Sequence, residues 1–288
     1  MRELDPDRQP LPVSDELLEC LTLGTTLQDQ GPVKTVRIVY SGRDAVVRFG
    51  PQAHLGEVYA MDFVRQHTPA GSIPLAPLLG LFISKDAPSN TDKPILYIVT
   101  EWIQDSQTLH AIWPSLEEHE KDGVTMQLRA ILHTLRSLEP PSSSVYIGAV
   151  GGGACSDLLL NGAGPFDTID DFIQSYVDIA KPCFRGHYIS IIERLLHKTK
   201  SYRIVLTHGD LALSNILVRK NLETGSWKIV ALVDWENSGW YPEHWEYLKL
   251  LGSVKWKSDW ALHAQNLLDR QYDEDFLLDN RLRLFHRL

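Results

Sequence analysis

A chain of 288 residues is long enough for one large domain or for two smaller lobes with a sizeable core. Its hydrophobic content of 43% and charged content of 23% are ordinary for a globular protein. Its formal net charge of -9 argues against a nucleic-acid partner, because phosphate backbones are bound by basic patches. The three cysteines have no paired spacing, which excludes a disulfide framework or a zinc site and indicates a reducing compartment.

The beginning of the chain, MRELDPDRQPLP, is charged and contains proline, so it does not have the pattern of a secretory signal. No apolar run approaches the ~20 residues that a membrane span needs. We therefore expect a soluble, cytoplasmic protein that does not bind membranes. The sequence does not indicate an oligomeric state.

The first elements predicted along the chain are mostly strands. A short helix opened by Ser14 precedes TVRIVYSGRDAVVRFG, in which two β-rich runs flank a turn. The segment HLGEVYAMDFVRQH has the apolar spacing of a helix. Two further strands, IPLAPLLGLFI and PILYIVTEWI, follow with the turn-rich SKDAPSNTDK between them. These elements predict a small β-rich lobe over residues 1–102.

The remainder, residues 103–288, is predicted to form a larger and mainly helical lobe. An amphipathic helix over VTMQLRAILHTLRSL is stopped by two prolines, and a Gly/Ser-rich loop, 142–164, follows it. Two more helices lie near TIDDFIQSYVDIA and YISIIERLLHKT. Three strands come next, in RIVLTHGD, NILV and WKIVALVDW, and short helices are expected beyond Trp240. The fold class is therefore α+β with two lobes.

The segment LTHGDLALSNILV places polar residues between two apolar runs. Asp210 and Asn215 are separated as in the kinase catalytic loop H-R-D-L-x-x-x-N, with Gly209 in place of the arginine. A carboxylate at this position can accept the proton of an attacking hydroxyl, and an amide oxygen can bind Mg²⁺ without adding charge. His208 is expected to orient the loop through a hydrogen bond.

A second carboxylate, Asp234, ends the apolar run IVALV. A hairpin-like pairing of the two strands would bring Asp234 beside Asn215, and oxygen ligands without Cys or His favour Mg²⁺ over zinc. The alternative is that HGD is a plain turn and that Asp234 caps the next element. That alternative does not explain why Asn215 follows Asp210 at the kinase spacing and why Asp234 ends a separate strand.

The stretch LTHGDLALSNILV…IVALVDWENSGWYPEHWEY resembles the aminoglycoside phosphotransferase and choline kinase superfamily, in particular its fungal branch of small-molecule kinase-like proteins. VVRFG, HLGEVYAMDFV, YIVTEWI, YIGAVGGG and GPFDTIDDF occur in the expected order, so the resemblance covers nearly the whole chain. It implies a bilobal protein-kinase-like fold with ATP bound between the lobes.

The resemblance also implies roles for individual residues. Asp210 would be the catalytic base, and Asn215 and Asp234 would hold Mg²⁺. Glu57 would pair with the cation of the VVRFG strand, which touches the nucleotide phosphates. The stretch from Thr100 through Glu101 and Trp102 to Ile103 would be the hinge whose backbone meets the adenine.

One position departs from the family pattern. The family's usual lysine is replaced by Arg48, which is longer, planar and always charged. Arg48 either clamps the phosphates or leaves a protein with weak or no activity; it can also be read as a surface strand residue. The phosphate-covering loop LGTTLQDQGPVK lacks a G-x-G-x-x-G pattern.

Other residues near the motif are candidates for the acceptor site. Trp240 or Tyr241 could border the acceptor pocket, although core packing explains them as well. Glu236 could contact a cationic acceptor, or it could serve as a cap or in a salt bridge. The loop GAVGGG follows no strand and precedes no clear helix, so we interpret it as structural.

The sequence therefore predicts an ATP- and Mg²⁺-dependent kinase of a small hydroxyl-bearing molecule. The main alternative is a catalytically weak or inactive kinase-like binding or regulatory protein, which Arg48 and the missing glycine loop favour. A transferase that uses phosphorylation as a step toward elimination and a metal hydrolase built on His208, Asp210 and Asp234 are further alternatives. The acceptor itself is not specified, because fold and phosphate site say nothing about its pocket.

Overall fold

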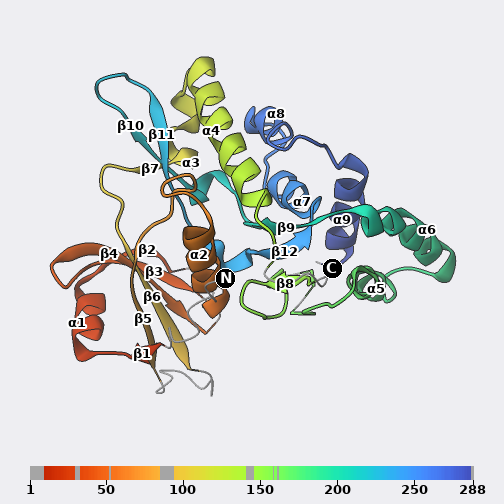
Figure 1. Cartoon of the computed structure of the whole chain (residues 1–288), viewed down its shortest axis with the longest axis horizontal. Helices are drawn as coiled ribbons and strands as arrows, with labels where there is room; N and C mark the ends of the chain where they lie inside the picture. The colour runs from red at the N-terminus through yellow and green to blue at the C-terminus, as the bar shows by residue number, and fades with distance from the viewer. Residues whose placement is uncertain are drawn as a thin grey trace.

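The computed structural model describes residues 10–29, 33–51, 53–84, 94–140, 146–157, 159–160 and 162–286. The start of the chain, most of the turn-rich segment 84–93 and part of the loops 23–34 and 142–164 therefore lie outside the described residues. The described part is a mixed α+β structure, as predicted, with a β-sheet region followed by a mainly helical region (Figure 1).

The N-terminal region is one six-stranded sheet with the order β1-β5-β6-β4-β3-β2. Its elements are β1 (Leu11–Pro12), α1 (Asp15–Leu23), β2 (Thr25–Gln28), β3 (Lys34–Tyr40), β4 (Arg43–Gly50), α2 (Leu55–His67), β5 (Leu78–Ser84) and β6 (Ile95–Glu101). The predicted hairpin of β3 and β4 is present, and α1 begins after Ser14, whose hydroxyl accepts a hydrogen bond from the Leu17 amide.

Helix α2 packs between the sheet and the helical region (Figure 1). Val58 packs with Leu81 and Ile98 of the sheet, whereas Met61 and Phe63 belong to the large core of the C-terminal region. Apolar residues on two faces thus fix α2 between the two regions. Glu57, in the first turn of this helix, is held at the same boundary.

The C-terminal region contains the remaining helices and two small sheets. Its elements are β7 (Gln107–Thr108), α3 (Leu109–Ile112), η1 (Trp113–Ser115), α4 (Glu118–Arg136), β8 (Gly148–Ala149), α5 (Ile169–Ala180), α6 (Gly186–Leu196), η2 (His197–Ser201), β9 (Ile204–Thr207), η3 (Leu213–Asn215), β10 (Ile216–Lys220), β11 (Trp227–Leu232), η4 (Trp235–Asn237), β12 (Gly239–Pro242), α7 (Trp245–Gly252), α8 (Trp260–Ala264) and α9 (Asp273–His286).

Two sheets of the C-terminal region position the polar motif. Strands β10 and β11 pair antiparallel, which confirms the predicted hairpin, and β7 adds to β10. The second sheet has the order β8-β12-β9. Strand β12 was not predicted, because GWYP contains both glycine and proline. It pairs here because Gly239 lets the backbone approach Gly148, where a Cβ atom would lie 2.5 Å from the Gly148 carbonyl oxygen.

Candidate active site

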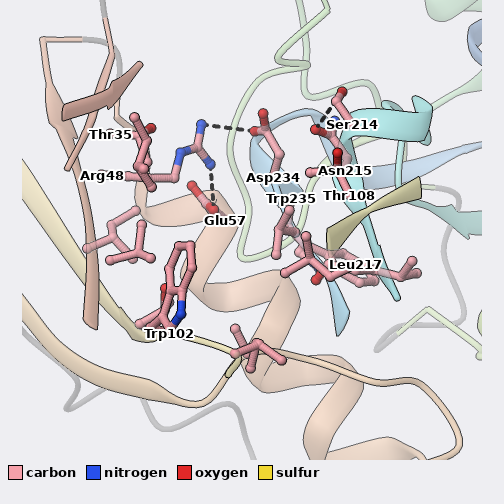
Figure 2. A pocket seen from close by; sticks show the side chains of 18 of the residues that line it. Thr35, Arg48, Glu57, Trp102, Thr108, Ser214, Asn215, Leu217, Asp234 and Trp235 are labelled. Carbon is pink, nitrogen blue, oxygen red and sulfur yellow. Dashed lines mark hydrogen bonds and ion pairs between the residues drawn. The ribbon is translucent and has the colours of Figure 1, made fainter. Parts of the chain in front are cut away.

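A cavity of about 670 Å³ lies between the sheet region and the helical region. The sheet region contributes β4, β6 and the start of α2, and the helical region contributes the segment after β9, strand β10 and the end of β11 (Figure 2). The predicted site residues that line it are Arg48, Glu57, Glu101, Trp102, Ile103, Asp210, Asn215 and Asp234. Residues separated by most of the chain therefore meet in one cleft.

Arg48 projects from β4 into a group of three carboxylates. Its guanidinium lies 2.6 Å from Glu57 Oε1, 2.9 Å from Asp234 Oδ1 and 2.8 Å from Glu236 Oε2. Figure 2 shows the guanidinium between Glu57 on one side and Asp234 on the other. The structure thus forms the pair of Arg48 with Glu57 that the resemblance implied.

The charged side chains of this group shift one another's pKa values. Burial lowers the pKa of Arg48, but the three carboxylates outweigh burial and the net shift is upward. Burial raises the pKa of Glu57, and the guanidinium opposes that shift only in part. Arg48 is therefore a permanent cation that holds together the two sides of the cleft.

The catalytic-loop motif places Asp210 and Asn215 side by side. Asn215 Nδ2 donates hydrogen bonds to the backbone oxygen of Asp210 at 2.9 Å and to its Oδ2 at 3.0 Å. Burial and the nearby charge of Asp234 raise the pKa of Asp210, whereas the hydrogen bond from Asn215 lowers it. The Asp210 carboxylate is consequently a better proton acceptor than an exposed aspartate.

His208 lies beneath this loop and does not line the cleft. Its side chain is fully buried, packs on Trp235, and accepts a hydrogen bond at Nδ1 from the Asp210 amide at 3.3 Å. Burial lowers its pKa to about 3, so the imidazole is neutral at physiological pH. The orienting contact expected from the sequence is present.

Asp234 follows β11 in a left-handed backbone conformation, with φ of 68° and ψ of 61°. Few residues other than glycine adopt this conformation, and aspartate is among those that tolerate it. The amide of Val233 donates to the backbone oxygen of Asn215, which fixes the two segments next to each other. Asp234 Oδ1 is buried and lacks a well-aligned hydrogen bond, although it is within ion-pair distance of Arg48.

The donor atoms of this corner suit Mg²⁺. Asp234 offers carboxylate oxygens and Asn215 offers a carboxamide oxygen, and both residues line the cleft. Oxygen ligands are the ones that Mg²⁺ prefers. The poorly satisfied Oδ1 of Asp234 is an atom that a bound cation would satisfy, so the residues fit the ion.

The expected hinge also lines the cleft. Two of its amides are already used, because Glu101 N donates to the Pro77 oxygen and Trp102 N donates to the Asp44 oxygen. Trp102 packs under the guanidinium of Arg37 at 4.4 Å. Apolar side chains form the walls beside the hinge, namely Val46, Ala76, Ile98, Leu217 and Leu232.

The structure places two acceptor-site candidates in the core, which agrees with the alternative of core packing, and engages the third in an ion pair. Trp240 and Tyr241 are buried in β12 and do not line the cleft; Trp240 packs on Phe63, and Tyr241 stacks on Trp245. Both side chains were placed from their position in the sequence, which does not reveal which way a strand residue faces. Glu236 is engaged by Arg48, so it is not a free carboxylate for a cationic acceptor.

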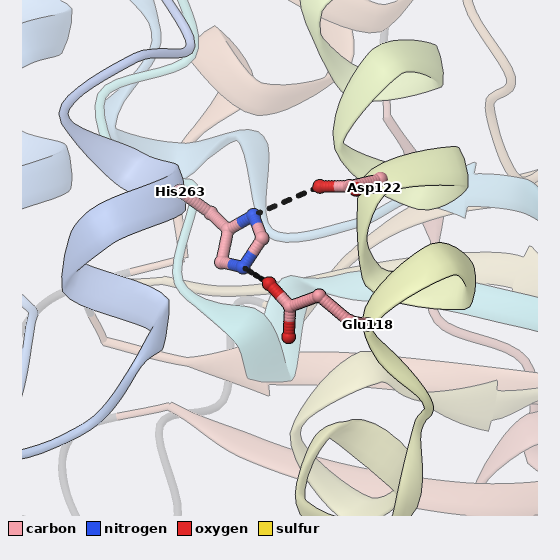
Figure 3. A group of neighbouring side chains, drawn as sticks. All are labelled: Glu118, Asp122 and His263. Carbon is pink, nitrogen blue, oxygen red and sulfur yellow. Dashed lines mark ion pairs between the residues drawn. The ribbon is translucent and has the colours of Figure 1, made fainter.

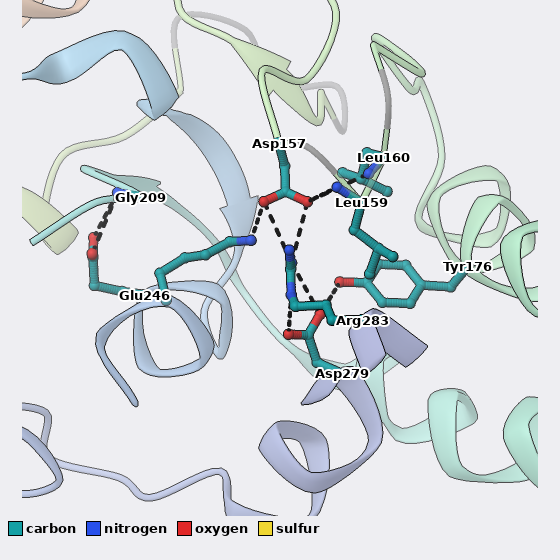
Figure 4. A network of polar contacts seen from close by, with 9 residues as sticks. Asp157, Leu159, Leu160, Tyr176, Gly209, Glu246, Asp279 and Arg283 are labelled. Carbon is teal, nitrogen blue, oxygen red and sulfur yellow. Dashed lines mark hydrogen bonds and ion pairs between the residues drawn. The ribbon is translucent and has the colours of Figure 1, made fainter. Parts of the chain in front are cut away.

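Sequence reasoning missed a buried carboxylate that holds the catalytic loop. Glu246, on α7, is fully buried and accepts a hydrogen bond from the amide of His208 at 2.7 Å. It also accepts one from the amide of Gly209 at 3.3 Å (Figure 4). Burial raises its pKa to about 7, against the opposing effect of these amides. A glutamate among the mostly apolar residues of the helix WEYLKLLG was the available signal.

A network of buried charges lies next to Glu246 (Figure 4). Asp157 pairs with Lys249 of α7 and with Arg283 of α9, and Arg283 also pairs with Asp279. Asp157 lines a second cavity of about 530 Å³, together with the start of α2 and the loop 149–153 that we interpreted as structural. The network ties this cavity wall to the helix that holds the catalytic loop.

One further group of potential metal ligands lies away from the cleft. Glu118 and Asp122 of α4 flank His263 of α8, but they approach different ring nitrogens, Nε2 at 3.6 Å and Nδ1 at 4.0 Å (Figure 3). A metal ion binds a single nitrogen of an imidazole, so this arrangement is better described as ion pairs between two helices.

Comparison with known proteins identifies the class. The model of the phosphotransferase enzyme family matches residues 32–285, and the chain belongs to this family. It is a phosphotransferase of the small-molecule kinase class. No curated protein sequence matches it.

Solved structures of aminoglycoside phosphotransferases have the same fold. One is a thermostable mutant of APH(4)-Ia in ternary complex with ADP and hygromycin B, with 15% identity, coverage of 96% of this chain and 92% of the other, and a TM-score of 0.58. The ADP-bound APH(2'')-Ib has 14% identity, coverage of 96% and 86%, and a TM-score of 0.55. At this identity the similarity establishes the fold and not the substrate.

Among the described residues, no helix is long and apolar enough to cross a membrane.

Proposed function

We propose that this protein transfers the γ-phosphoryl group of ATP to a hydroxyl group of a small molecule, with Mg²⁺ as the metal. In this proposal residues 1–102 bind the nucleotide, and residues 103–288 supply the catalytic residues and bind the acceptor. One observation carries the proposal: Asp210, Asn215 and Asp234 face the same cavity as the ion pair of Arg48 with Glu57.

The cleft fits a nucleotide in size and chemistry. Its volume of about 670 Å³ lies within the usual range for small-molecule sites. The apolar walls beside the hinge would hold the adenine. Because the amides of Glu101 and Trp102 are used internally, the amide of Ile103 is the donor that we assign to the base.

The phosphates would lie at the opposite end of the cleft, against Arg48 and the pair Asn215 and Asp234. Bound Mg²⁺ would supply positive charge to the phosphoryl oxygens, with Asn215 and Asp234 as its protein ligands. Arg48 can donate two parallel hydrogen bonds to a phosphate group. Its contact with Glu57 fixes the direction of its side chain before the nucleotide binds.

Asp210 is assigned as the base that orients the acceptor hydroxyl and takes up its proton. Asn215 holds one carboxylate oxygen, and His208 holds the Asp210 backbone in place as a neutral group. Glu246 fixes the two residues before Asp210 through their amides. Positioning and electrostatics of this kind supply most of the rate in phosphoryl transfer.

A second candidate function is a kinase-like binding protein with little or no turnover. The observation that favours it is the engagement of Arg48 by three carboxylates, two more than the single pairing with Glu57 requires. A thermal-shift titration with Mg·ATP and a turnover assay together separate the two functions. Stabilisation by nucleotide without turnover on any acceptor would support the binding protein.

The test of the proposed function is an ADP-release screen over hydroxylated amines, sugars and small alcohols. Asp210→Asn serves as the blank, because it keeps the shape of the site and removes the base. We expect acceptor-dependent ADP release that falls by at least about 10²-fold in this variant, with nucleotide binding retained. Equal release by both proteins would remove Asp210 from the role of base.

A further inference from the structure

Four arginines line one cavity of the helical region, which shares no lining residue with the cleft described above. This cavity of about 790 Å³ is lined by α4, by the ends of β9 and β12, and by the segment between α8 and α9. We call it the arginine groove after Arg129, Arg136, Arg203 and Arg270. We propose that this groove binds a small phosphate-bearing anion.

The charge of the groove differs from that of the whole chain. Its four guanidinium groups face only two carboxylates among the lining residues, those of Glu243 and Asp269. The difference is 4 - 2, a local surplus of two positive charges in a chain whose formal net charge is -9. Concentrated positive charge in a concave surface attracts anions.

Glu243 contacts three of the four arginines and does not use all of their N–H groups. Its carboxylate lies 3.1 Å from Arg203 Nε and 3.8 Å from an Arg270 nitrogen, and its backbone oxygen accepts a hydrogen bond from Arg136 at 2.9 Å. A guanidinium has five N–H groups. The Glu243 contacts use one N–H group of Arg203 and one of Arg136, and the contact with Arg270 is an ion pair without a hydrogen bond. Arg129 pairs with Asp269 at 2.7 Å, and Arg136 has a further hydrogen bond with the Tyr272 side chain. Each guanidinium still has more N–H groups than these contacts use.

Aromatic rings further restrict Arg270. Its guanidinium lies 5.1 Å from the ring centre of Tyr202 and 5.0 Å from that of Tyr272. A side chain held in this way loses less conformational entropy when it binds a ligand. The Arg203 and Arg270 side chains are nevertheless 70% and 61% exposed, so an anion can reach both.

The groove is separate from the nucleotide cleft. Arg203 immediately precedes β9 and Glu243 immediately follows β12, and these strands pair antiparallel. The catalytic loop begins at the other end of β9, roughly 16 Å of extended chain away. A ligand in the arginine groove therefore does not occupy the site that we assign to ATP.

The geometry favours phosphate over other anions. Arginine forks form paired hydrogen bonds with phosphate oxygens, and several forks around one cavity suit an anion with more than one charge. The groove also has apolar lining residues, Leu267 and Leu268, which would contact the organic part of such a molecule. A phosphorylated metabolite and inorganic polyphosphate share this chemistry.

The test is calorimetric titration with inorganic pyrophosphate in the absence of divalent metal ions. We expect saturable binding that weakens at least about tenfold in Arg203→Gln and in Arg270→Gln, since each change removes charge-assisted hydrogen bonds to the anion. Arg270→Lys keeps the charge but not the fork, so an intermediate loss is expected. A sugar phosphate titrated in parallel shows whether an organic group adds affinity.

The control is Arg194→Gln, which removes an exposed arginine of α6 and the same net charge. We expect it to bind pyrophosphate within about twofold of the parent. Absence of saturable binding would overturn the proposal, and so would binding that both groove variants retain. An equal loss in Arg194→Gln would assign the effect to overall charge. Thermal unfolding of each variant confirms that it is folded.

Discussion

Replacing Arg48 by methionine tests whether one guanidinium holds the cleft together. The change removes the cation and leaves three carboxylates, of which Glu57 is the most buried, with 6% of its side chain exposed. Leaving a buried charge without its partner costs about 3–5 kcal/mol. Asp234 and Glu236 are 27% and 31% exposed, and each adds at most about 1 kcal/mol. We expect a loss of about 3–5 kcal/mol of unfolding free energy, most of it through Glu57.

The assay is urea unfolding followed by tryptophan fluorescence, because Trp235 is buried at the end of the cleft. Adding Glu57→Gln to Arg48→Met provides the matched test, since it removes the buried Glu57 carboxylate that has lost its partner Arg48. The double variant Arg48→Met/Glu57→Gln should recover about 2 kcal/mol relative to Arg48→Met. A loss below about 1 kcal/mol in the single variant, or no recovery in the double variant, would refute the reasoning.

Three further predictions concern other parts of the site. Asp234→Asn should abolish the Mg²⁺-dependent part of the thermal stabilisation by ATP, and an unchanged Mg²⁺ effect would remove Asp234 as a ligand. Burial raises the pKa of Glu246 from 4.5 to about 7. Protonation of Glu246 therefore contributes stability that is fully present below pH 4.5 and is lost as the pH rises through 7. Chemical unfolding from pH 5 to 8 should show this loss of unfolding free energy in the parent and not in Glu246→Gln. Asp157→Ala strands the buried Lys249, while Arg283 keeps Asp279, and should lower the unfolding free energy by about 3–5 kcal/mol. The exposed Asp178→Ala should change it by less than about 1 kcal/mol.

Most strands and helices could be predicted because their patterns are local. The alternation of β3 and β4 around a turn and the helical spacing of α2 need only neighbouring residues. Helix α4 starts at Glu118, before the predicted start, because Glu117 and Glu120 form a capping box that the apolar pattern does not reveal. Strand β12 depends on a partner strand far away in the sequence.

The site, too, has a part that local sequence patterns predict and a part that depends on contacts between distant residues. Asp210 and Asn215 lie within one short loop, and their spacing alone indicated their proximity. The contact of Arg48 with Glu236 joins residues 188 positions apart, and no local pattern encodes it. Glu246 and Asp157 were missed because a buried charge is visible in a sequence only when its partner is known.

The pairing of Asp157 with Arg283 has a consequence for the way this protein is made. The two residues are 126 positions apart, and ribosomes add about 5–20 residues per second, so Asp157 is synthesised roughly 6–25 s before Arg283. All six strands of the N-terminal sheet are complete by Glu101 and can pair during this interval. The loop that carries Asp157 obtains its counterion Arg283 only after α9 has been synthesised. The N-terminal sheet is therefore expected to be in place before the wall of the second cavity is completed.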